Sequence, residues 1–153
     1  NQVQKGFVTT VDDLCRNLGE GGVFKKKNNA PITAKDGKLD IVVWRRFADG
    51  RPGQLIGFGQ CKTGTHWPRH LPELNPDSFC DKWMSDRPAV SPIRLFFIAD
   101  RSIRRWYDHC KDGGLLLDRC RIMEYCSNLP DALLDRIARW VRAAASAHSL
   151  RLP

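Results

Sequence analysis

The sequence predicts a mixed α/β fold in which a mixed β-sheet is flanked by helices. Apolar side chains recur at helical spacing near both ends of the chain, over residues 7–18 and 130–148. Between them lie two β-branched runs joined by a turn, residues 38–63, and a strongly apolar run at residues 93–100. Because helical and strand patterns alternate along the chain, we expect helices to cover the faces of one sheet.

The first helix is predicted over residues 7–18, and Gly19 ends its apolar pattern. A short edge strand is expected at Val23 and Phe24, before a basic and polar loop that continues to Pro31. This part of the chain therefore contributes one helix and one strand at the edge of the sheet.

A hairpin is predicted next. The stretch "KLDIVVWRRF", residues 38–47, is rich in β-branched side chains and is typical of a buried strand. The stretch "ADGRPG", residues 48–53, has the composition of a turn, and "QLIGFGQCKT", residues 54–63, is the returning strand. The two strands are therefore expected to pair antiparallel.

The middle of the chain predicts a long loop and a central strand. Residues 64–92 are rich in proline and polar side chains, with one short helix expected near residues 78–84. The stretch "IRLFFIAD", residues 93–100, is the strongest strand pattern, because five consecutive positions from Leu95 to Ala99 are apolar.

The last third predicts a helix, a strand and a helix. Residues 102–110 are expected to form a helix with Ser102 as its N-cap. Residues 115–126 are expected to form a strand, and residues 130–148 an amphipathic helix with Pro130 in its first turn.

The chain has 153 residues, the size of one domain with a sizeable core. We therefore expect a single domain over residues 1–153, alone or within a longer protein. No stretch approaches the roughly 20 apolar residues of a membrane span, and no signal peptide is visible. A cytoplasmic protein that does not enter the membrane is expected.

The formal net charge is +8, with Lys and Arg spread along the whole chain. Such an excess favours a polyanionic partner, most often nucleic acid, over a basic surface that serves only solubility.

The six cysteines form no C-x-x-C pair, which argues against a zinc ribbon and favours the reduced thiols of a cytosolic protein. His66 and His70 are four residues apart in a segment with prolines, and we interpret them as loop or surface histidines.

The returning strand carries the residues that suggest a site. Because strand side chains alternate, Gln60 and Lys62 lie on one face, and folding the hairpin near Arg51 brings Asp40 beside one of them. Asp40 could instead cap a backbone group or pair with a lysine. A buried Asp–Lys pair contributes little to stability, however, and therefore points to a functional site.

The helix, the hairpin with Asp40 and the Gln60-x-Lys62 pattern, and the following αβ unit resemble the PD-(D/E)XK nuclease superfamily, which has the restriction-endonuclease-like fold. The Gln form is similar to Mrr-type restriction enzymes. Gly37, three residues before Asp40, matches the glycine-containing approach of that family. The resemblance covers residues 7–100 and implies an αβββαβ core, with the C-terminal strand and helix as additions.

This resemblance assigns roles by position. Asp40 would be the metal-binding carboxylate, Gln60 would stand where most of the superfamily has Glu, and Lys62 would be the catalytic lysine. The cofactor would be Mg²⁺ or Mn²⁺, since hard cations prefer oxygen ligands. Further ligands are expected from the backbone carbonyl of Cys61 and from Glu20, just past the first helix.

Six residues are expected to contact nucleic acid: Lys25, Lys26, Lys27, Thr63, Thr65 and Trp67. The lysines would form a basic loop and the threonines would hold a phosphate where the strand ends. Trp67 would stack on a base. The alternatives are a solvated loop, an ordinary strand-ending turn and a core tryptophan.

The sequence and the resemblance together predict a Mg²⁺-dependent endonuclease that hydrolyses phosphodiester bonds in DNA rather than RNA. The resemblance places it in bacterial restriction or anti-phage defence, with a homodimer or a partner protein directing its activity. Two alternatives remain open. One is a catalytically inactive nucleic-acid-binding module on the same fold, and the other is a small zinc-stabilised interaction domain.

Overall fold

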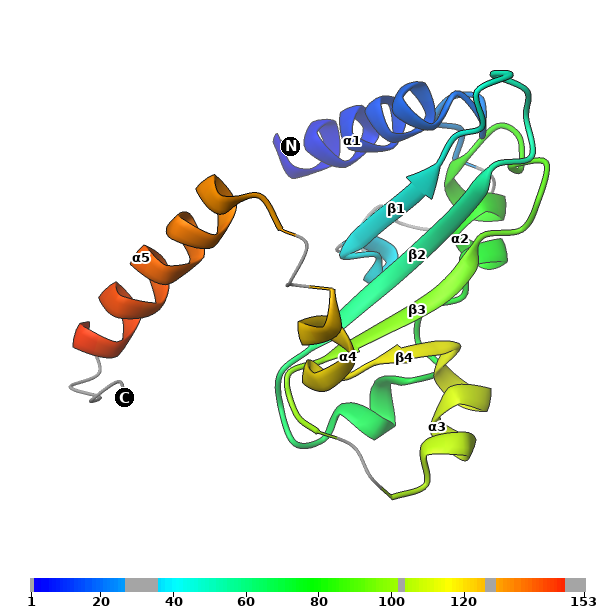
Figure 1. Cartoon of the computed structure of the whole chain (residues 1–153). Helices are drawn as coiled ribbons and strands as arrows, with labels where there is room; N and C mark the ends of the chain where they lie inside the picture. Colours follow the sequence, from blue (N-terminus) through cyan, green and yellow to red (C-terminus); the bar gives the residue numbers. More distant parts are fainter. Residues whose placement is uncertain (1, 27–35, 102–103, 126–128, 148–153) are drawn as a thin grey trace. The chain divides into compact units, whose positions relative to one another are not determined.

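The computed structural model describes residues 2–26, 36–101, 104–125 and 129–147 (Figure 1). The chain forms two compact units, residues 1–119 and residues 120–153, where the sequence predicts one domain. All four strands belong to the first unit.

The first unit contains α1 (Gln2–Leu18), η1 (Asp36–Lys38), β1 (Ile41–Arg45), β2 (Leu55–Lys62), η2 (Trp67–His70), α2 (Pro76–Trp83), β3 (Ile93–Ile98), α3 (Trp106–Gly113) and β4 (Leu115–Leu117), where η marks a short 3₁₀ helix. Two further helices follow, α4 (Arg119–Glu124) and α5 (Asp131–Ala147). The predicted terminal helices and the three main strands are therefore confirmed.

The strands form one mixed sheet in the order β1-β2-β3-β4, as Figure 1 shows. β1 pairs antiparallel with β2, whereas β3 runs parallel to both β2 and β4. The hairpin register places Ile41 opposite Gly59. This is a four-stranded mixed sheet flanked by helices, which confirms the predicted class of fold.

The core lies between the helices and one face of the sheet. Phe58 of β2 and Phe96 of β3 point to this face and are fully buried. Ten buried residues form the larger cluster: Val11, Cys15, Leu18, Ile56, Phe58, Leu74, Phe79, Cys80, Trp83 and Met84. A second cluster consists of Trp67, Leu71, Phe96, Ile98 and Leu116. Gln60 lies between Phe58 and Lys62 on the face that these clusters cover, since side chains of a strand alternate.

Three predicted elements differ from the structure. The expected strand at Val23 and Phe24 is only an isolated bridge between Phe24 and Met84. The helix expected at residues 102–110 begins at Trp106 instead, and its predicted cap, Ser102, lies outside the described residues.

The strand predicted over residues 115–126 is wrong beyond Leu117, where the chain turns into α4. β4 pairs with β3 only as far as the contact between Leu117 and Phe97. The Arg, Met and Glu residues that follow are good helix formers, so the chain becomes helical once this pairing ends.

None of the described helices is both long and apolar enough to cross a membrane.

Candidate active site at the open end of the hairpin

Asp40 lies at the open end of the β1–β2 hairpin, opposite Gln60 when the strand register is continued by one residue. Its Oδ2 accepts a 2.7 Å hydrogen bond from the backbone N–H of Cys61, and its own N–H donates to the Gly59 carbonyl at 2.9 Å. The predicted proximity of Asp40 and Gln60 is therefore confirmed. The structure also shows that Asp40 holds the end of β2.

A tight turn at Gly37 and Lys38 directly precedes the segment that carries Asp40. Gly37 and Lys38 both have positive φ, 56° and 66°. A Cβ at position 37 would lie 2.9 Å from the ring of Phe79, which is closer than real Cβ contacts. Both the backbone conformation and the close packing therefore favour glycine at this position.

Gln60 is the buried member of the site, with a side chain that is 0% exposed. Its Nε2 donates a 3.0 Å hydrogen bond to Oε2 of Glu73. The other end of the amide, Oε1, is also buried and has no hydrogen-bond partner among the described residues. A buried carbonyl oxygen without a partner costs about 1–3 kcal/mol. Gln54 Oε1, at the other end of β2, is likewise buried without a partner among the described residues.

Glu73, in the segment between η2 and α2, connects three side chains at the site. His70 Nδ1 lies 2.7 Å from Oε1, and Lys38 Nζ lies 3.7 Å from Oε2, the oxygen that also accepts from Gln60. The hydrogen bond with His70 lowers the pKa of Glu73 to about 2. Burial opposes this effect, while Gln60 and Lys38 add to it. Glu73 is therefore an anion that accepts hydrogen bonds and cannot donate them.

The sequence analysis did not find Glu73 or its partner Lys38, and it treated His70 as a surface residue. The three-residue spacing between His70 and Glu73 is a local signal for that pair, because residues at this spacing are neighbours on a helical turn. The contact with Gln60 has no local signal, since the two residues are thirteen positions apart in the sequence.

Lys62 is half-buried at the end of β2, beside Ile98 of β3. It lies two residues after Gln60 and therefore on the same face. Thr63 and Thr65 are exposed in the segment that follows, so their side chains are accessible. The structure thus places Asp40, Gln60 and Lys62 at one end of the hairpin. Asp40 is exposed, however, so it does not form the buried Asp–Lys pair on which the sequence argument relied.

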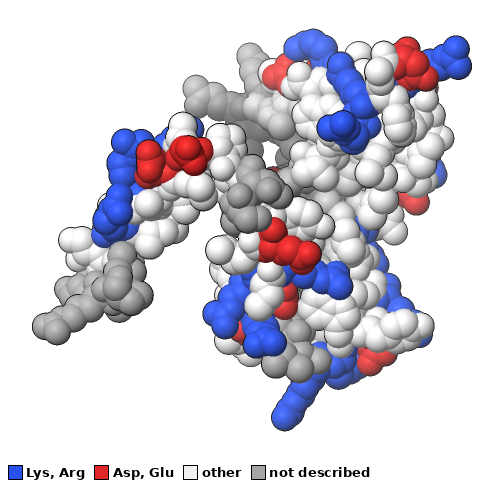
Figure 2. Space-filling model, viewed as in Figure 1, with Lys and Arg blue, Asp and Glu red and all other residues white. Residues whose placement is uncertain are grey.

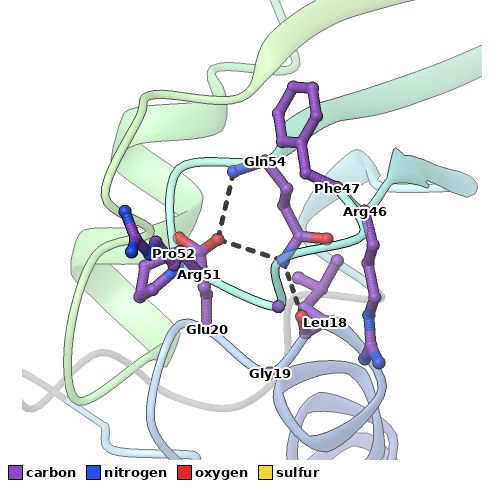
Figure 3. Close-up of a pocket in the computed structure, with 9 residues that line it drawn as sticks. Leu18, Gly19, Glu20, Arg46, Phe47, Arg51, Pro52 and Gln54 are labelled. Atoms are coloured by element: carbon purple, nitrogen blue, oxygen red, sulfur yellow. Dashed lines mark hydrogen bonds between the residues drawn. The ribbon is translucent and has the colours of Figure 1, made fainter.

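Glu20 lies near the start of β2, where Figure 3 shows its carboxylate beside Gln54, whereas Asp40 contacts the other end of that strand. Its Oε1 accepts hydrogen bonds from the backbone N–H of Gly53 (3.0 Å) and from both the backbone N–H and the side chain of Gln54. Its Oε2 accepts from Ala89 N–H (2.8 Å).

Gln60 comes six positions after Gln54 along the chain, a path of roughly 20 Å at about 3.3 Å per strand residue. Burial raises the pKa of Glu20, but the hydrogen bonds from Ala89, Gln54 and Gly53 outweigh it and leave that pKa below its usual value. Glu20 therefore fastens the end of α1 to the hairpin turn, and the structure does not bring it to the predicted metal site.

Of the residues predicted to contact nucleic acid, the structure leaves some exposed and buries another. Trp67 is 7% exposed and packs edge-on against His109 with 4.7 Å between ring centroids, so its ring belongs to the core and cannot stack on a base. Lys25 and Lys26 are exposed beyond the bridge at Phe24, and the backbone of Lys25 bonds to Trp83. Lys27 lies outside the described residues.

The basic side chains do not form one continuous patch on the face seen in Figure 2. Lys and Arg appear there in several separate groups, with Asp and Glu among them. The net charge of +8 is therefore distributed over the surface in this view rather than concentrated.

The donor set at the hairpin end fits a hard cation that keeps several waters. The described residues hold no group of three or more His, Cys, Asp or Glu side chains that could bind a metal ion. A group of this kind includes neither side-chain amide oxygens nor backbone carbonyl oxygens, which can also bind a hard cation. Gln60 Oε1 is a buried oxygen without a partner, and Asp40 uses Oδ2 in its bond to Cys61 and retains Oδ1.

The carbonyl of Cys61 completes this donor set. The N–H and C=O groups of one strand residue point to the same side. Because the Cys61 N–H faces Asp40, its carbonyl faces the same edge, beyond the start of β1. Comparisons of this chain with protein-family models, with curated proteins and with solved structures found no match.

Proposed function

We propose that this chain is a metal-dependent endonuclease domain that hydrolyses phosphodiester bonds in DNA, on a restriction-endonuclease-like fold. The observation that carries the proposal is the convergence of Asp40, Gln60 and Lys62 at one end of the hairpin, with a buried, unpartnered oxygen on Gln60. The antiparallel hairpin followed by a parallel strand also supports it.

In this proposal Asp40 Oδ1, Gln60 Oε1 and the Cys61 carbonyl hold Mg²⁺ or Mn²⁺. The ion would neutralise charge on the scissile phosphate and activate a water. Lys62 stabilises the negative charge that develops on the phosphoryl oxygens. The exposed Thr63 and Thr65 bind a neighbouring phosphate and position the strand.

The proposal is tested by incubating supercoiled plasmid with the protein and Mg²⁺ or Mn²⁺, with Lys62→Ala beside wild type. Lys111→Ala serves as the matched control, since Lys111 is exposed in the last turn of α3, where its ammonium lies over the ring of Tyr107. Nicking by wild type and Lys111→Ala but not by Lys62→Ala supports the proposal. Equal activity in all three proteins contradicts it.

A second candidate is a nucleic-acid-binding module that does not cleave. Among the described residues, Glu73 already uses its carboxylate to accept from the Gln60 amide, and Asp40 has one of its two oxygens bonded to a backbone N–H, so little negative charge is left for a metal ion. A gel shift with DNA and no cleavage with either ion would favour this function.

The setting of the proposed activity rests on the family resemblance. A cytoplasmic nuclease of bacterial restriction or anti-phage defence is proposed, acting on DNA rather than RNA, as a homodimer or under the direction of a partner protein. The basic net charge supports a nucleic-acid partner.

A further inference from the structure

We propose that Glu73 is a positioning residue, which orients the side-chain amide of Gln60 so that its carbonyl oxygen is the atom presented to a divalent cation. This inference rests on the proposed function. It explains how a glutamine can serve at a position where only one end of its side chain can bind a metal.

The problem for any metal-binding glutamine is that its two ends have nearly the same shape. Rotation by half a turn exchanges the oxygen, which can bind a cation, for an NH₂ group, which cannot. A carboxylate has no such ambiguity, because its two oxygens are equivalent. A buried glutamine at a metal site therefore needs a neighbour that accepts hydrogen bonds and does not donate them.

Glu73 is such a neighbour. Its Oε2 lies 3.0 Å from Gln60 Nε2, and turning the amide over would bring two oxygens to that distance. Glu73 is itself held in place by His70 at 2.7 Å and by Lys38 at 3.7 Å. Three elements of the structure, η1, η2 and β2, thus meet at one carboxylate and determine the direction of one amide.

In Gln60 the Nε2 end is bonded to Glu73, while Oε1 is buried without a partner among the described residues. Gln54 has the same arrangement with Glu20, so the unpartnered oxygen alone assigns no function. Gln60 differs from Gln54 in lying opposite Asp40 and two residues before Lys62, and this location favours a role toward a cation.

The decisive substitution is Glu73→Gln. The new side chain has one oxygen in place of two, so it can no longer accept from both His70 Nδ1 and Gln60 Nε2. When that oxygen accepts from His70, the NH₂ group faces Gln60, whose amide must turn over to offer Oε1 in return. We expect the affinity for Mg²⁺, measured by calorimetric titration of the full chain, to fall about tenfold, in the range seen for groups that orient metal ligands. The matched control is Asp13→Asn, which removes an equal charge from the exposed surface of α1.

The exchanged pair Gln60→Glu with Glu73→Gln tests orientation directly. The carboxylate at position 60 accepts from the new amide with one oxygen and still offers the other to the cation. Because a carboxylate has no wrong orientation, we expect Glu73→Gln to cost no affinity in this background, so the double variant should bind Mg²⁺ as tightly as Gln60→Glu alone. If Glu73 acted only by stabilising the surrounding structure, Glu73→Gln would lower the affinity of wild type and of Gln60→Glu equally.

A second measurement observes the amide without metal. In ¹⁵N spectra of the wild-type chain, the side-chain NH₂ signal of Gln60 is identified by its loss in Gln60→Glu. We expect this NH₂ group to exchange slowly with solvent, and its signal to shift and exchange faster in Glu73→Gln.

The outcomes separate this inference from the function on which it rests. If wild type binds neither Mg²⁺ nor Mn²⁺, the proposed metal site and this inference both fail. If wild type binds and Glu73→Gln binds equally well, or if Glu73→Gln weakens binding equally in wild type and in Gln60→Glu, the role of Glu73 is overturned while the proposed function stands.

Discussion

The side-chain amide of Gln60 donates a 3.0 Å hydrogen bond to the carboxylate of Glu73, and this contact joins the centre of the sheet to the segment between η2 and α2. Glu73 in turn contacts Lys38, two residues before Asp40. The candidate site is therefore one connected group of polar side chains in which the hairpin and the segments that cover it are coupled.

Asp40 has two roles that substitutions can separate: its side chain accepts a hydrogen bond from the Cys61 N–H, and it supplies the negative charge of the proposed metal site. Asp40→Asn keeps a carbonyl oxygen that can accept from the Cys61 N–H but loses the negative charge. We expect nearly unchanged thermal stability, no cleavage and weakened Mg²⁺ binding. Asp40→Ala should in addition lose about 0.5–1.5 kcal/mol of unfolding free energy with the hydrogen bond. Full metal-dependent activity in folded Asp40→Asn protein would contradict the site.

Lys62→Ala should abolish cleavage and leave most of the affinity for DNA. A contact made to the transition state changes the rate, whereas the other phosphate contacts of a basic protein persist. The measurement is a gel shift at several salt concentrations beside a nicking assay. We expect the salt dependence of binding to fall by about one phosphate contact. Equal losses of binding and cleavage would mean that Lys62 only binds.

Gln60→Glu should raise the affinity for Mg²⁺, since hard cations bind more tightly to carboxylates. The metal-free variant should be less stable, because the new carboxylate is buried and faces Glu73 at about hydrogen-bond distance. Repulsion raises the pKa of one member of that pair. The penalty therefore disappears as pH falls, so the variant should gain stability between about pH 7 and pH 5. An unchanged affinity for Mg²⁺ would mean that the side chain at position 60 does not face the ion.

Acid should destabilise the wild-type protein through Glu73. Its pKa falls from the ordinary 4.5 to about 2 in the folded state, so the stabilisation is present above pH 4.5 and is lost as pH falls toward 2. Thermal melts between pH 6 and pH 2.5 measure this loss. Glu73→Gln should show a flatter profile in the same window, and an equally steep profile would mean that other groups cause the acid sensitivity.

Gly37→Ala should disturb the approach to Asp40. The substitution places a side chain at φ 56° and 2.9 Å from the Phe79 ring, so we expect a loss of about 1–3 kcal/mol. Metal binding should weaken with it. Gly50→Ala is the matched control, because Gly50 has a similar φ of 65° but no atom within 4 Å of the added Cβ. Denaturant unfolding of the two variants measures the difference, and equal losses would mean that the Phe79 contact contributes nothing.

The sequence by itself determined the class of fold, the hairpin and the identity of its polar residues. Alternating side chains place Gln60 and Lys62 on one face, and a short turn leaves few registers, so the sequence predicts Asp40 beside one of these two residues. The strand register in the structure selects Gln60. These features depend on local periodicity, which neighbouring residues specify. The end of β4 at Leu117 was not predicted, because a strand ends where its pairing with the neighbouring strand ends and not where its own pattern changes.

Only the tertiary structure decided which other side chains meet the hairpin. Glu20 and Glu73 are both carboxylates at some distance along the chain from Asp40, yet one binds the hairpin turn and the other binds Gln60. Trp67 follows the strand in sequence but is buried against His109. The packing of α1, η2 and α2 on the sheet sets these contacts, and no short-range pattern records it, because residues far apart in the chain become neighbours only when the core closes.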